Sequence, residues 1–208
     1  MEKKTLKKAT FITVEGLEGS GKSSVVNFLA NFLKEKKFTV KVFRDPGSTD
    51  IGEKIRALLL DKKNKKMSKY TELLLYLAAR AQLIEEKLKG AFKNYDFVIC
   101  DRFFDSTIVY QGYALGLGKL AKKAVEMFLQ GIRPDLTIVL ITDPQAGLKR
   151  IRKKDRIESR PLSFHDRLKN GYLKLAEKEP ARIKVIDANT NLDAIFDCVK
   201  KILCKKFI

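Results

Sequence analysis

Residues 10–24 read TFITVEGLEGSGKSS, and this stretch decides the fold class. Residues 10–15 form a short β-branched run, and residues 23–36 carry apolar side chains at helical spacing. Between them, Gly16–Ser23 has the pattern G-x-x-x-x-G-K-[ST], which forms a phosphate-binding loop when a strand precedes it and a helix follows it. The stretch therefore predicts a P-loop nucleotide-binding domain.

The glycines, the lysine and the serine of this loop each suit phosphate binding. Glycines let successive backbone N–H groups converge on phosphate oxygens, and the N-terminus of the following helix adds a favourable dipole. Lys22 is expected to bridge the β- and γ-phosphates of ATP, and the Ser23 hydroxyl to ligand Mg²⁺. The loop residues expected to bind the donor nucleotide are Gly16, Leu17, Glu18, Gly19, Ser20, Gly21, Lys22, Ser23 and Ser24. A chance Gly-rich turn is the alternative, and the flanking strand and helix argue against it.

The alternation of strand and helix continues along the chain. Apolar or β-branched runs predict strands at residues 10–15, 39–43, 96–101, 136–141 and 183–187. Helical periodicity predicts helices at residues 23–36, 51–60, 70–89, 119–129, 146–152, 163–178 and 192–204. No linker or repeat interrupts residues 1–208, so we expect a single α/β domain: a three-layer P-loop sandwich with a mainly parallel five-stranded sheet, flanking helices and a small lid. Ligands of such sheets bind beyond the carboxyl ends of the strands.

Composition limits the class of protein. The chain has 208 residues, of which 45% are hydrophobic, which is enough for one sizeable core. Its three cysteines, Cys100, Cys198 and Cys204, have no metal-ligand spacing and are expected to be reduced thiols. The chain has neither a signal-peptide pattern nor an apolar run long enough to span a bilayer. A soluble cytoplasmic protein that does not enter a membrane is therefore expected.

The formal charge of +18 attracts polyanions, which include nucleic acid and phosphorylated small molecules. Much of the excess comes from lysines at predicted termini and loops, within Lys3–Lys8, Lys34–Lys37, Lys62–Lys66 and Lys200–Lys206. Such scattered charges are typical of a solvated surface. Nucleic acid is therefore not expected as a partner, although an ATP-dependent nucleic-acid-binding protein remains the alternative from another class.

Two further segments suggest phosphoryl transfer. Asp101 ends the apolar run 96–101, where a P-loop protein places the acid that organises Mg²⁺, directly or through water. The adjacent Arg102 can clamp a second phosphate with its planar fork, and a surface salt bridge is the alternative. Residues 153–162 are expected to form a basic lid with Arg156 and Arg160, approached by Arg150 and Arg152. A solvated charged loop is the alternative to the lid.

From about residue 10 to the C-terminus, the chain resembles the bacterial thymidylate kinases. The similar segments, in the same order and spacing, are GLEGSGKSS (16–24), RDPGST (44–49), YLAARAQL (76–83), DRFFDSTIVYQG (101–112), RPDLT (133–137) and DRIE (155–158). The resemblance implies transfer of the ATP γ-phosphate to dTMP, which gives dTDP and ADP on the route to dTTP, with Mg²⁺ as cofactor. It also implies a homodimer formed by helices. Another nucleotide or deoxynucleoside kinase of the same fold is the close rival.

The resemblance also implies roles for single residues around the phosphates. Glu18 matches the acid near the sugar 3′-hydroxyl, and Arg56 and Arg102 match arginines that hold the acceptor phosphate. Some members carry an arginine inside the P-loop, but here Gly19 occupies that position, so cationic help is expected from the lid. Arg156 is the first candidate for this help and Arg152 the second. The residues expected to act in catalysis are Lys22, Arg102, Arg156, Glu18 and Asp101.

Base recognition is assigned by the same resemblance. Tyr76 is expected to stack on thymine, and Arg80, one helical turn later on the same face, to hydrogen-bond its O4. Thr107 and Gln111 match base-reading positions, and Tyr110 matches the aromatic residue that disfavours ribonucleotides. The expected substrate-binding residues are Glu18, Arg56, Tyr76, Arg80, Arg102, Ser106, Thr107, Tyr110 and Gln111.

The sequence departs from the family pattern at a few positions. Asp45 stands where Glu is common, Arg160 where an acid is common, and Ile141 where many members have Asp. The change at Asp45 is mild, and those at Ile141 and Arg160 concern details of the lid contacts rather than the reaction. The only histidine, His165, is expected to have a surface or packing role.

Overall fold

The structure, a computed structural model, describes residues 9–208, so the basic segment Lys3–Lys8 lies outside the described residues. Its strands are β1 (Thr10–Gly16), β2 (Val40–Arg44), β3 (Phe97–Asp101), β4 (Leu136–Ile141) and β5 (Ile183–Asp187). Its α-helices are α1 (Lys22–Glu35), α2 (Asp50–Leu60), α3 (Lys69–Leu83), α4 (Lys89–Asn94), α5 (Phe104–Thr107), α6 (Gly118–Phe128), α7 (Pro144–Lys149), α8 (Leu162–Lys178) and α9 (Leu192–Phe207). Shorter segments are the 3₁₀ turn Lys62–Asn64 and the π-helical segments Ile84–Leu88 and Ile108–Ala114.

The five strands form one sheet in the order β2-β3-β1-β4-β5, and each neighbouring pair is parallel. The predicted α/β fold with its five-stranded sheet is therefore confirmed. In the register, Asp101 of β3 lies opposite both Val14 of β1 and Arg44 of β2, and Gly16 lies opposite Leu140 of β4. The carboxyl ends of four strands thus lie side by side.

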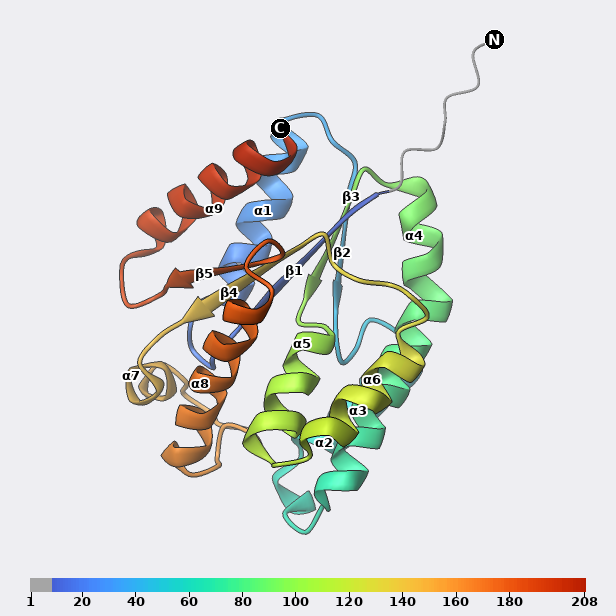
Figure 1. Ribbon diagram of the computed structural model, residues 1–208, viewed down its shortest axis with the longest axis vertical. Coiled ribbons are helices and arrows are strands. Elements are labelled where there is room, and N and C mark those ends of the chain that lie inside the picture. Colours follow the sequence, from blue (N-terminus) through green and yellow to red (C-terminus); the bar gives the residue numbers. More distant parts are fainter. Residues whose placement is uncertain (1–8) are drawn as a thin grey trace.

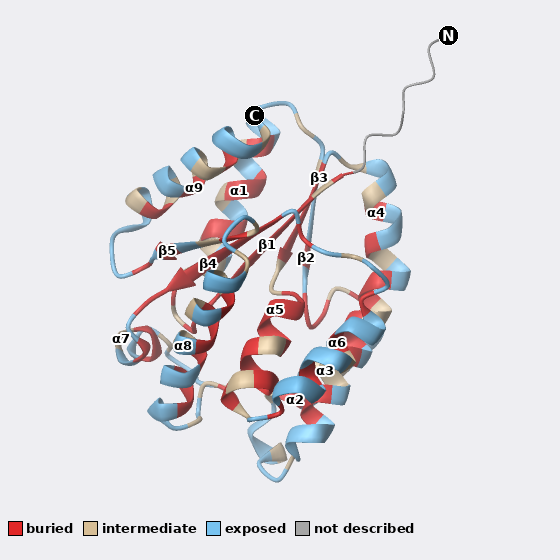
Figure 2. Ribbon diagram, viewed as in Figure 1, coloured by how far each residue is buried: buried red, intermediate tan, exposed pale blue. Residues whose placement is uncertain are grey.

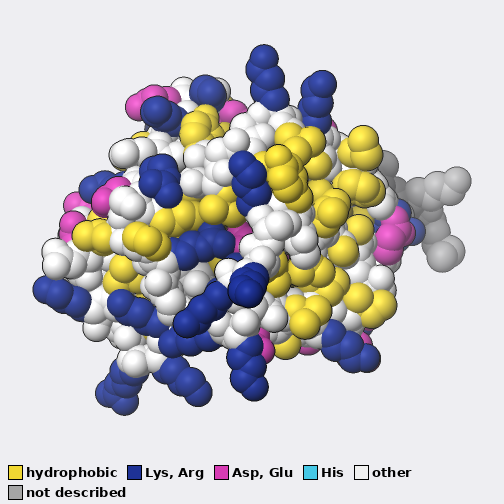
Figure 3. Space-filling view, turned by 90° about the horizontal axis from the view of Figure 1, so that it is seen from below, with side chains coloured by type: hydrophobic (Ala, Val, Ile, Leu, Met, Phe, Trp, Pro, Cys, Tyr) yellow, Lys and Arg dark blue, Asp and Glu magenta, His cyan; other side chains and the backbone are white. Residues whose placement is uncertain are grey.

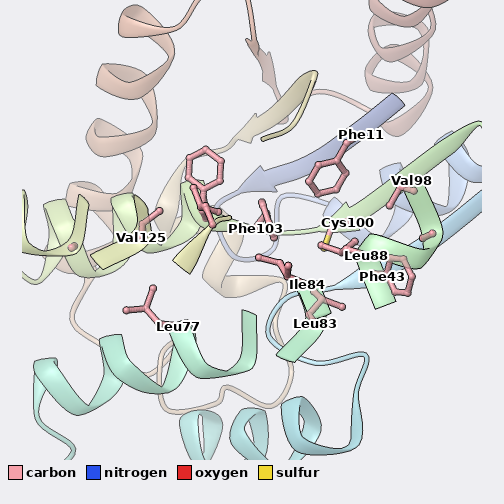
Figure 4. Packing of buried hydrophobic residues seen from close by; sticks show 14 of the residues in the cluster. Phe11, Phe43, Leu77, Leu83, Ile84, Leu88, Val98, Cys100, Phe103 and Val125 are labelled. Carbon is pink, nitrogen blue, oxygen red and sulfur yellow. The ribbon is translucent and has the colours of Figure 1, made fainter. Parts of the chain in front are cut away.

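Helices cover both faces of the sheet (Figure 1), because side chains of successive strand residues point to opposite faces. Ile12 and Val14 pack in a core with α1 and α9. Phe11, which precedes Ile12 in sequence, packs on the other face with Phe103 and residues of α3 and α6 (Figure 4). Figure 2 shows the resulting pattern: the strands and the inward helix surfaces are buried, and the outward helix surfaces are exposed.

Several helices begin at a side chain that caps the first backbone N–H groups. Thr49 accepts a hydrogen bond from Gly52 N at the start of α2, and Ser68 does so from Thr71 N at α3. Asp143 and Asn191 cap α7 and α9 in the same way. These local contacts explain why the predicted helix starts agree closely with the structure. None of the helices that the structure describes has both the length and the apolar content to cross a lipid bilayer.

The helix at residues 104–114 was not predicted. It is formed by α5 and the π-helical segment that continues it, and most of its side chains are buried. A helix that is buried on nearly all sides lacks the polar face that makes helical periodicity visible in a sequence. Its β-branched residues, which include Thr107, Ile108 and Val109, also have low helix propensity. The helix predicted at residues 70–89 is longer in the structure than in the prediction. Helix α3 continues through the π-helical segment Ile84–Leu88 into α4, which ends at Asn94.

Candidate active site

A cavity of about 260 Å³ opens at the carboxyl ends of β1, β2 and β3. Its lining residues come from the loop after β1, the ends of β2 and β3, helices α2 and α3, the helix at residues 104–114 and the segment after α7. The lining residues are Glu18, Gly19, Lys22, Ser23, Arg44, Asp45, Pro46, Arg56, Leu60, Tyr76, Arg80, Asp101, Arg102, Ser106, Tyr110, Gln111, Asp155, Ile157 and Glu158. Most of the residues predicted to bind substrates are therefore brought together in one hollow. Figure 3 shows this end of the molecule, with Lys and Arg side chains gathered on its left and centre.

The phosphate-binding loop is held by close backbone packing. Gly19 has a left-handed φ of 69°, and a Cβ there would lie 2.1 Å from the Gly147 carbonyl oxygen of α7. No larger residue fits without moving that backbone, so an arginine is excluded from this position by the packing of α7. The loop residues Glu18, Gly19, Lys22 and Ser23 line the cavity. The other predicted loop residues, Gly16, Leu17, Ser20, Gly21 and Ser24, are not among its lining residues.

Lys22 lies at the start of α1, and its Nζ donates to the Leu17 carbonyl oxygen across the loop at 2.6 Å. Burial, and then the charge of Arg102, lower the pKa of the Lys22 ammonium to about 8. Burial and the charges of Arg44 and Arg102 also lower the pKa of Arg56. Cations that disfavour one another in this way are ready to take up an anion, because a phosphate between them would relieve the repulsion.

Glu18 is the centre of a buried polar cluster. Its Oε1 accepts a hydrogen bond from the Tyr110 hydroxyl and lies 3.6 Å from Arg102 Nη2, and its Oε2 lies 3.3 Å from His165 Nδ1. Burial alone would raise the pKa of Glu18, but the His165 hydrogen bond and the charges of Arg102 and Lys22 outweigh it and lower that pKa to about 2. Glu18 is therefore a carboxylate at neutral pH. His165 is 1% exposed, so a surface position is wrong for this residue.

Arg102 follows β3 in a left-handed conformation with φ of 67°, which is costly for a residue with a side chain and frequent at functional sites. Its Nη1 donates to Ser106 Oγ at 3.1 Å and to the Tyr172 hydroxyl at 3.2 Å. Both hydroxyls in turn donate to the buried Glu15 carboxylate, at 2.5 and 2.8 Å. Burial raises the pKa of Glu15 to about 7, against the opposing charge of Arg102. Ser106 and Tyr172 therefore fix the orientation of the Arg102 guanidinium, and Arg102 still lines the cavity.

Arg80 of α3 also lines the cavity, is 2% exposed and is held by three hydrogen-bond partners. Its Nε donates to Asp45 Oδ2 at 2.6 Å, and its Nη2 donates to Thr107 Oγ1 at 2.8 Å and to the Phe103 carbonyl oxygen at 3.2 Å. Among the described residues, Arg80 Nη1 and Asp45 Oδ1 are buried without a hydrogen-bond partner. Such orphaned polar atoms on a cavity wall are costly unless a ligand satisfies them. Thr107, predicted to read the base, lies behind Arg80 and does not line the cavity.

The expected placement of Arg156 against the transferred phosphate differs from its position in the structure. Its Nη2 pairs with Glu72 Oε2 at 2.7 Å and its Nε donates to the Leu59 carbonyl oxygen at 2.6 Å, and Arg156 is not a lining residue. The reason is burial: a guanidinium that is 8% exposed requires a charged partner, which Glu72 supplies. Arg152 is exposed. Of the arginines expected at the lid, Arg150 contacts the P-loop, and its Nη1 donates to the Gly19 carbonyl oxygen at 3.1 Å.

Four residues of this region were missed or misjudged by sequence reasoning: Glu15, Asp45, Glu72 and His165. Glu15, Asp45 and His165 bind partners far away in sequence, so no local spacing indicates them. Glu72 had a usable signal. It precedes Tyr76 by four residues and Arg80 by eight, which places all three on one face of α3.

Mg²⁺ fits the oxygen donors of this cavity. The Ser23 hydroxyl and the Asp101 carboxylate both line it, and a hard cation prefers such ligands. Within residues 9–208, no three His, Cys, Asp or Glu side chains are grouped to hold a metal ion. The remaining ligands would therefore come from nucleotide phosphates and water, as is usual for Mg²⁺.

The parallel sheet, the loop Gly16–Ser23 and the cation-lined cavity beyond it define a nucleotide-binding enzyme of the P-loop kinase class. The family model "Thymidylate kinase" matches residues 14–199. The thymidylate kinase of Clostridium novyi (strain NT) is 43% identical over 204 residues, which are 95% of this chain and 100% of that protein. That of Geobacillus thermodenitrificans (strain NG80-2) is 44% identical over 89% of this chain and 85% of its own length.

A solved structure agrees with these sequence relatives. The crystal structure of thymidylate kinase from Ehrlichia chaffeensis superposes with a TM-score of 0.77 at 31% identity, and the match covers 95% of this chain and 99% of that one. The chain belongs to the thymidylate kinase family.

Proposed function

We propose that the protein transfers the γ-phosphate of ATP to dTMP, giving ADP and dTDP. The observation that carries the proposal is the composition of a single cavity. Lys22 and Ser23 of the phosphate-binding loop line this cavity together with Arg80, whose Nη1 is unpartnered. Arg56 and Arg102 line the wall as well. A donor phosphate and an acceptor nucleotide therefore have adjoining sites.

The reaction itself needs position and charge neutralisation rather than a strong base. The acceptor phosphate is already ionised, so one of its oxygens can attack the γ-phosphorus in line. Lys22 would hold the β- and γ-phosphates, and Arg102 and Arg56 the acceptor phosphate. Glu18, kept ionised by its neighbours, would orient the sugar hydroxyl near it. Each group would act from a site that is already ordered, which limits reorganisation during the reaction.

Mg²⁺ would be held by Ser23 and, directly or through water, by Asp101. When bound, it neutralises negative charge on the phosphates as they react. Ser23 has a second role in the proposal, because it lies in the first turn of α1, whose N-terminal N–H groups would face the phosphates. Asp101 is held in place by the strand pairing that sets it opposite Val14 and Arg44.

The segment between α7 and α8 is proposed to act as the lid of a single catalytic domain. Its residues Asp155, Ile157 and Glu158 line the cavity, and Arg150 at its start contacts the P-loop. We propose that Arg150 and the exposed Arg152 supply the cationic help that Arg156, paired with Glu72, does not offer in this arrangement. A cytoplasmic location belongs to the same proposal, because the reaction consumes ATP and a free nucleotide.

The test is a coupled assay of ADP release with ATP and Mg²⁺, in which dTMP, dUMP, dCMP, dGMP, dAMP and UMP are offered in parallel. We expect rapid turnover that depends on dTMP. Lys22→Ala should lose turnover with every acceptor, by on the order of 10²- to 10³-fold, because a cation on the reacting phosphates is removed. Arg80→Ala should lose dTMP turnover while the residual activity no longer prefers thymine.

The outcomes of this assay separate the alternatives. Preference for another acceptor would leave the family membership intact but reject dTMP as the substrate. Turnover that no acceptor stimulates would reject the kinase proposal, and ATP hydrolysis stimulated by polynucleotide would favour the nucleic-acid alternative. Equal loss with all monophosphates in Arg80→Ala would reject the role of Arg80 in base recognition.

We further propose a homodimer formed through α2, α3 and α6. Helix α3 contacts both α2 and α6. These helices carry exposed apolar side chains: Ile51, Leu58, Tyr70, Leu74, Leu120, Met127 and Phe128. Figure 3 shows hydrophobic side chains gathered on the right of that view, and such patches mark interaction surfaces.

Sedimentation velocity should detect a dimer at micromolar concentration. Leu74→Glu, at a residue that is 63% exposed, should shift the protein toward monomer, because a charge would be buried in the interface. The matched control is Leu192→Glu on α9, where the side chain is 45% exposed and lies outside the patch. A wild-type protein that sediments as a monomer would reject the dimer.

A further inference from the structure

Glu72 is a fully buried carboxylate that no step of the proposed reaction uses. Its Oε1 accepts a hydrogen bond from Gln111 Nε2 at 2.9 Å. Its Oε2 accepts from Arg156 Nη2 at 2.7 Å and from Arg160 Nη2 at 2.5 Å. One carboxylate oxygen therefore serves Gln111, and the other is held by two guanidinium groups from the segment after α7.

This arrangement decides which way the Gln111 amide faces. The two ends of a glutamine amide have nearly the same shape, so only their hydrogen-bond partners distinguish the oxygen from the nitrogen. A carboxylate held by two guanidinium groups offers only acceptors, so the amide nitrogen of Gln111 must face Glu72. Gln111 is 1% exposed and lines the cavity. The atom left for a ligand is consequently its carbonyl oxygen.

We propose that Glu72 is a positioning residue that fixes the base specificity of the acceptor site through Gln111. The inference rests on the proposed dTMP kinase function. With Glu72 in place, Gln111 offers the acceptor Oε1, and Arg80 offers the unpartnered donor Nη1. Thymine and uracil present the complementary pair, an N3–H donor and an O4 acceptor. Cytosine presents the opposite pair, an N3 acceptor and an N4 amino donor.

The critical variant is Glu72→Gln, because it changes one atom of the side chain. The oxygen of the new amide stays with the two arginines, which only donate, so its NH₂ group turns toward Gln111. Gln111 must then offer its own oxygen to residue 72 and its NH₂ group to the ligand. The ratio of kcat/KM for dTMP to that for dCMP should fall about 10- to 100-fold, because the wrong atom meets N3.

Three comparisons separate this effect from general damage. The ratio for dTMP to dUMP should not change in Glu72→Gln, since both bases carry N3–H. The double variant Glu72→Gln with Gln111→Glu reverses the pair, because the carboxylate introduced at position 111 can accept from the new amide and still offers an acceptor to the base. It should restore most of the dTMP to dCMP ratio. Glu85→Gln, the same change at an exposed residue of the helix continuing from α3, should leave the ratio unchanged.

An unchanged dTMP to dCMP ratio in a folded Glu72→Gln enzyme would overturn the proposal. The proposal would also be overturned if the double variant Glu72→Gln with Gln111→Glu had the same low dTMP to dCMP ratio as Glu72→Gln. If Glu72→Gln does not fold, NMR of the wild-type protein provides the test: the Gln111 side-chain amide protons, assigned with Gln111→Met, should exchange slowly with solvent both with and without dTMP. Rapid exchange would contradict the fixed amide. This measurement needs no turnover, so it can fail or succeed independently of the proposed function.

Discussion

Arg102→Met should lower kcat for dTMP by on the order of 10³-fold, the largest catalytic effect that we expect from a single side chain outside the P-loop. The guanidinium lies on the cavity wall, 3.6 Å from Glu18 and oriented from behind by Ser106 and Tyr172. An ordered cation that can reach both the acceptor and the transferred phosphate lowers the barrier more than it strengthens binding, because charge shifts between those groups during the reaction. The loss should therefore appear in kcat, with a smaller change in KM for dTMP.

Steady-state kinetics with varied dTMP at saturating ATP and Mg²⁺ make this measurement. Arg133→Met is the matched control, since Arg133 is 46% exposed and pairs with Glu126 away from the cavity. Circular dichroism should accompany both variants, because loss of Arg102 also removes a charge close to the buried Glu15 and Glu18. A folded Arg102→Met enzyme that raises KM at unchanged kcat would contradict the catalytic role, since Arg102 would then only bind substrate.

The parts of this protein that could be predicted from sequence have local causes. The P-loop combines glycine spacing, a preceding strand and a following helix within residues 10–36, so its fold does not depend on distant residues. The buried strands β4 and β5 were predicted with the bounds that the structure has, because apolar runs between polar segments have few other conformations available. Ligands of parallel sheets bind beyond the carboxyl ends of the strands, so the predicted strands were enough to place Asp101 beside the P-loop.

The parts that could not be predicted depend on contacts between distant residues. The pairing of Arg156 with Glu72 spans 84 positions, and that of His165 with Glu18 spans 147. A charged segment such as DRIE has the same composition whether its arginine faces a phosphate or a buried carboxylate. The resemblance brought Gln111 to attention but not the residue that orients it, because a motif indicates ligand contacts more readily than the groups behind them.

A second group of buried polar residues supports the site from inside the sheet. Thr13 of β1 and Thr137 of β4 share a hydrogen bond of 2.8 Å on the face that α5 covers. Thr137 also contacts Asp105, which is fully buried one turn after Arg102. Arg182, just before β5, binds both oxygens of Asp105, at 2.6 and 2.9 Å. This bidentate pair connects the turn that carries Arg102 to the far side of the sheet.

Arg182→Met should therefore destabilise the fold by about 3 to 5 kcal/mol, because it leaves the Asp105 carboxylate buried without its cation. Urea unfolding at a fixed protein concentration, followed by circular dichroism, measures the change. In the double variant Asp105→Asn with Arg182→Met, much of the loss should be recovered, since the unpaired charge is gone. The matched control, Arg44→Met, breaks an ion pair with Glu53 in which both side chains are nearly half exposed, and should cost less than about 1 kcal/mol. If Arg182→Met were as mild as this control, the Asp105 pair would not anchor the turn, and Arg102 would have to be held by Glu15 and its hydroxyl partners alone.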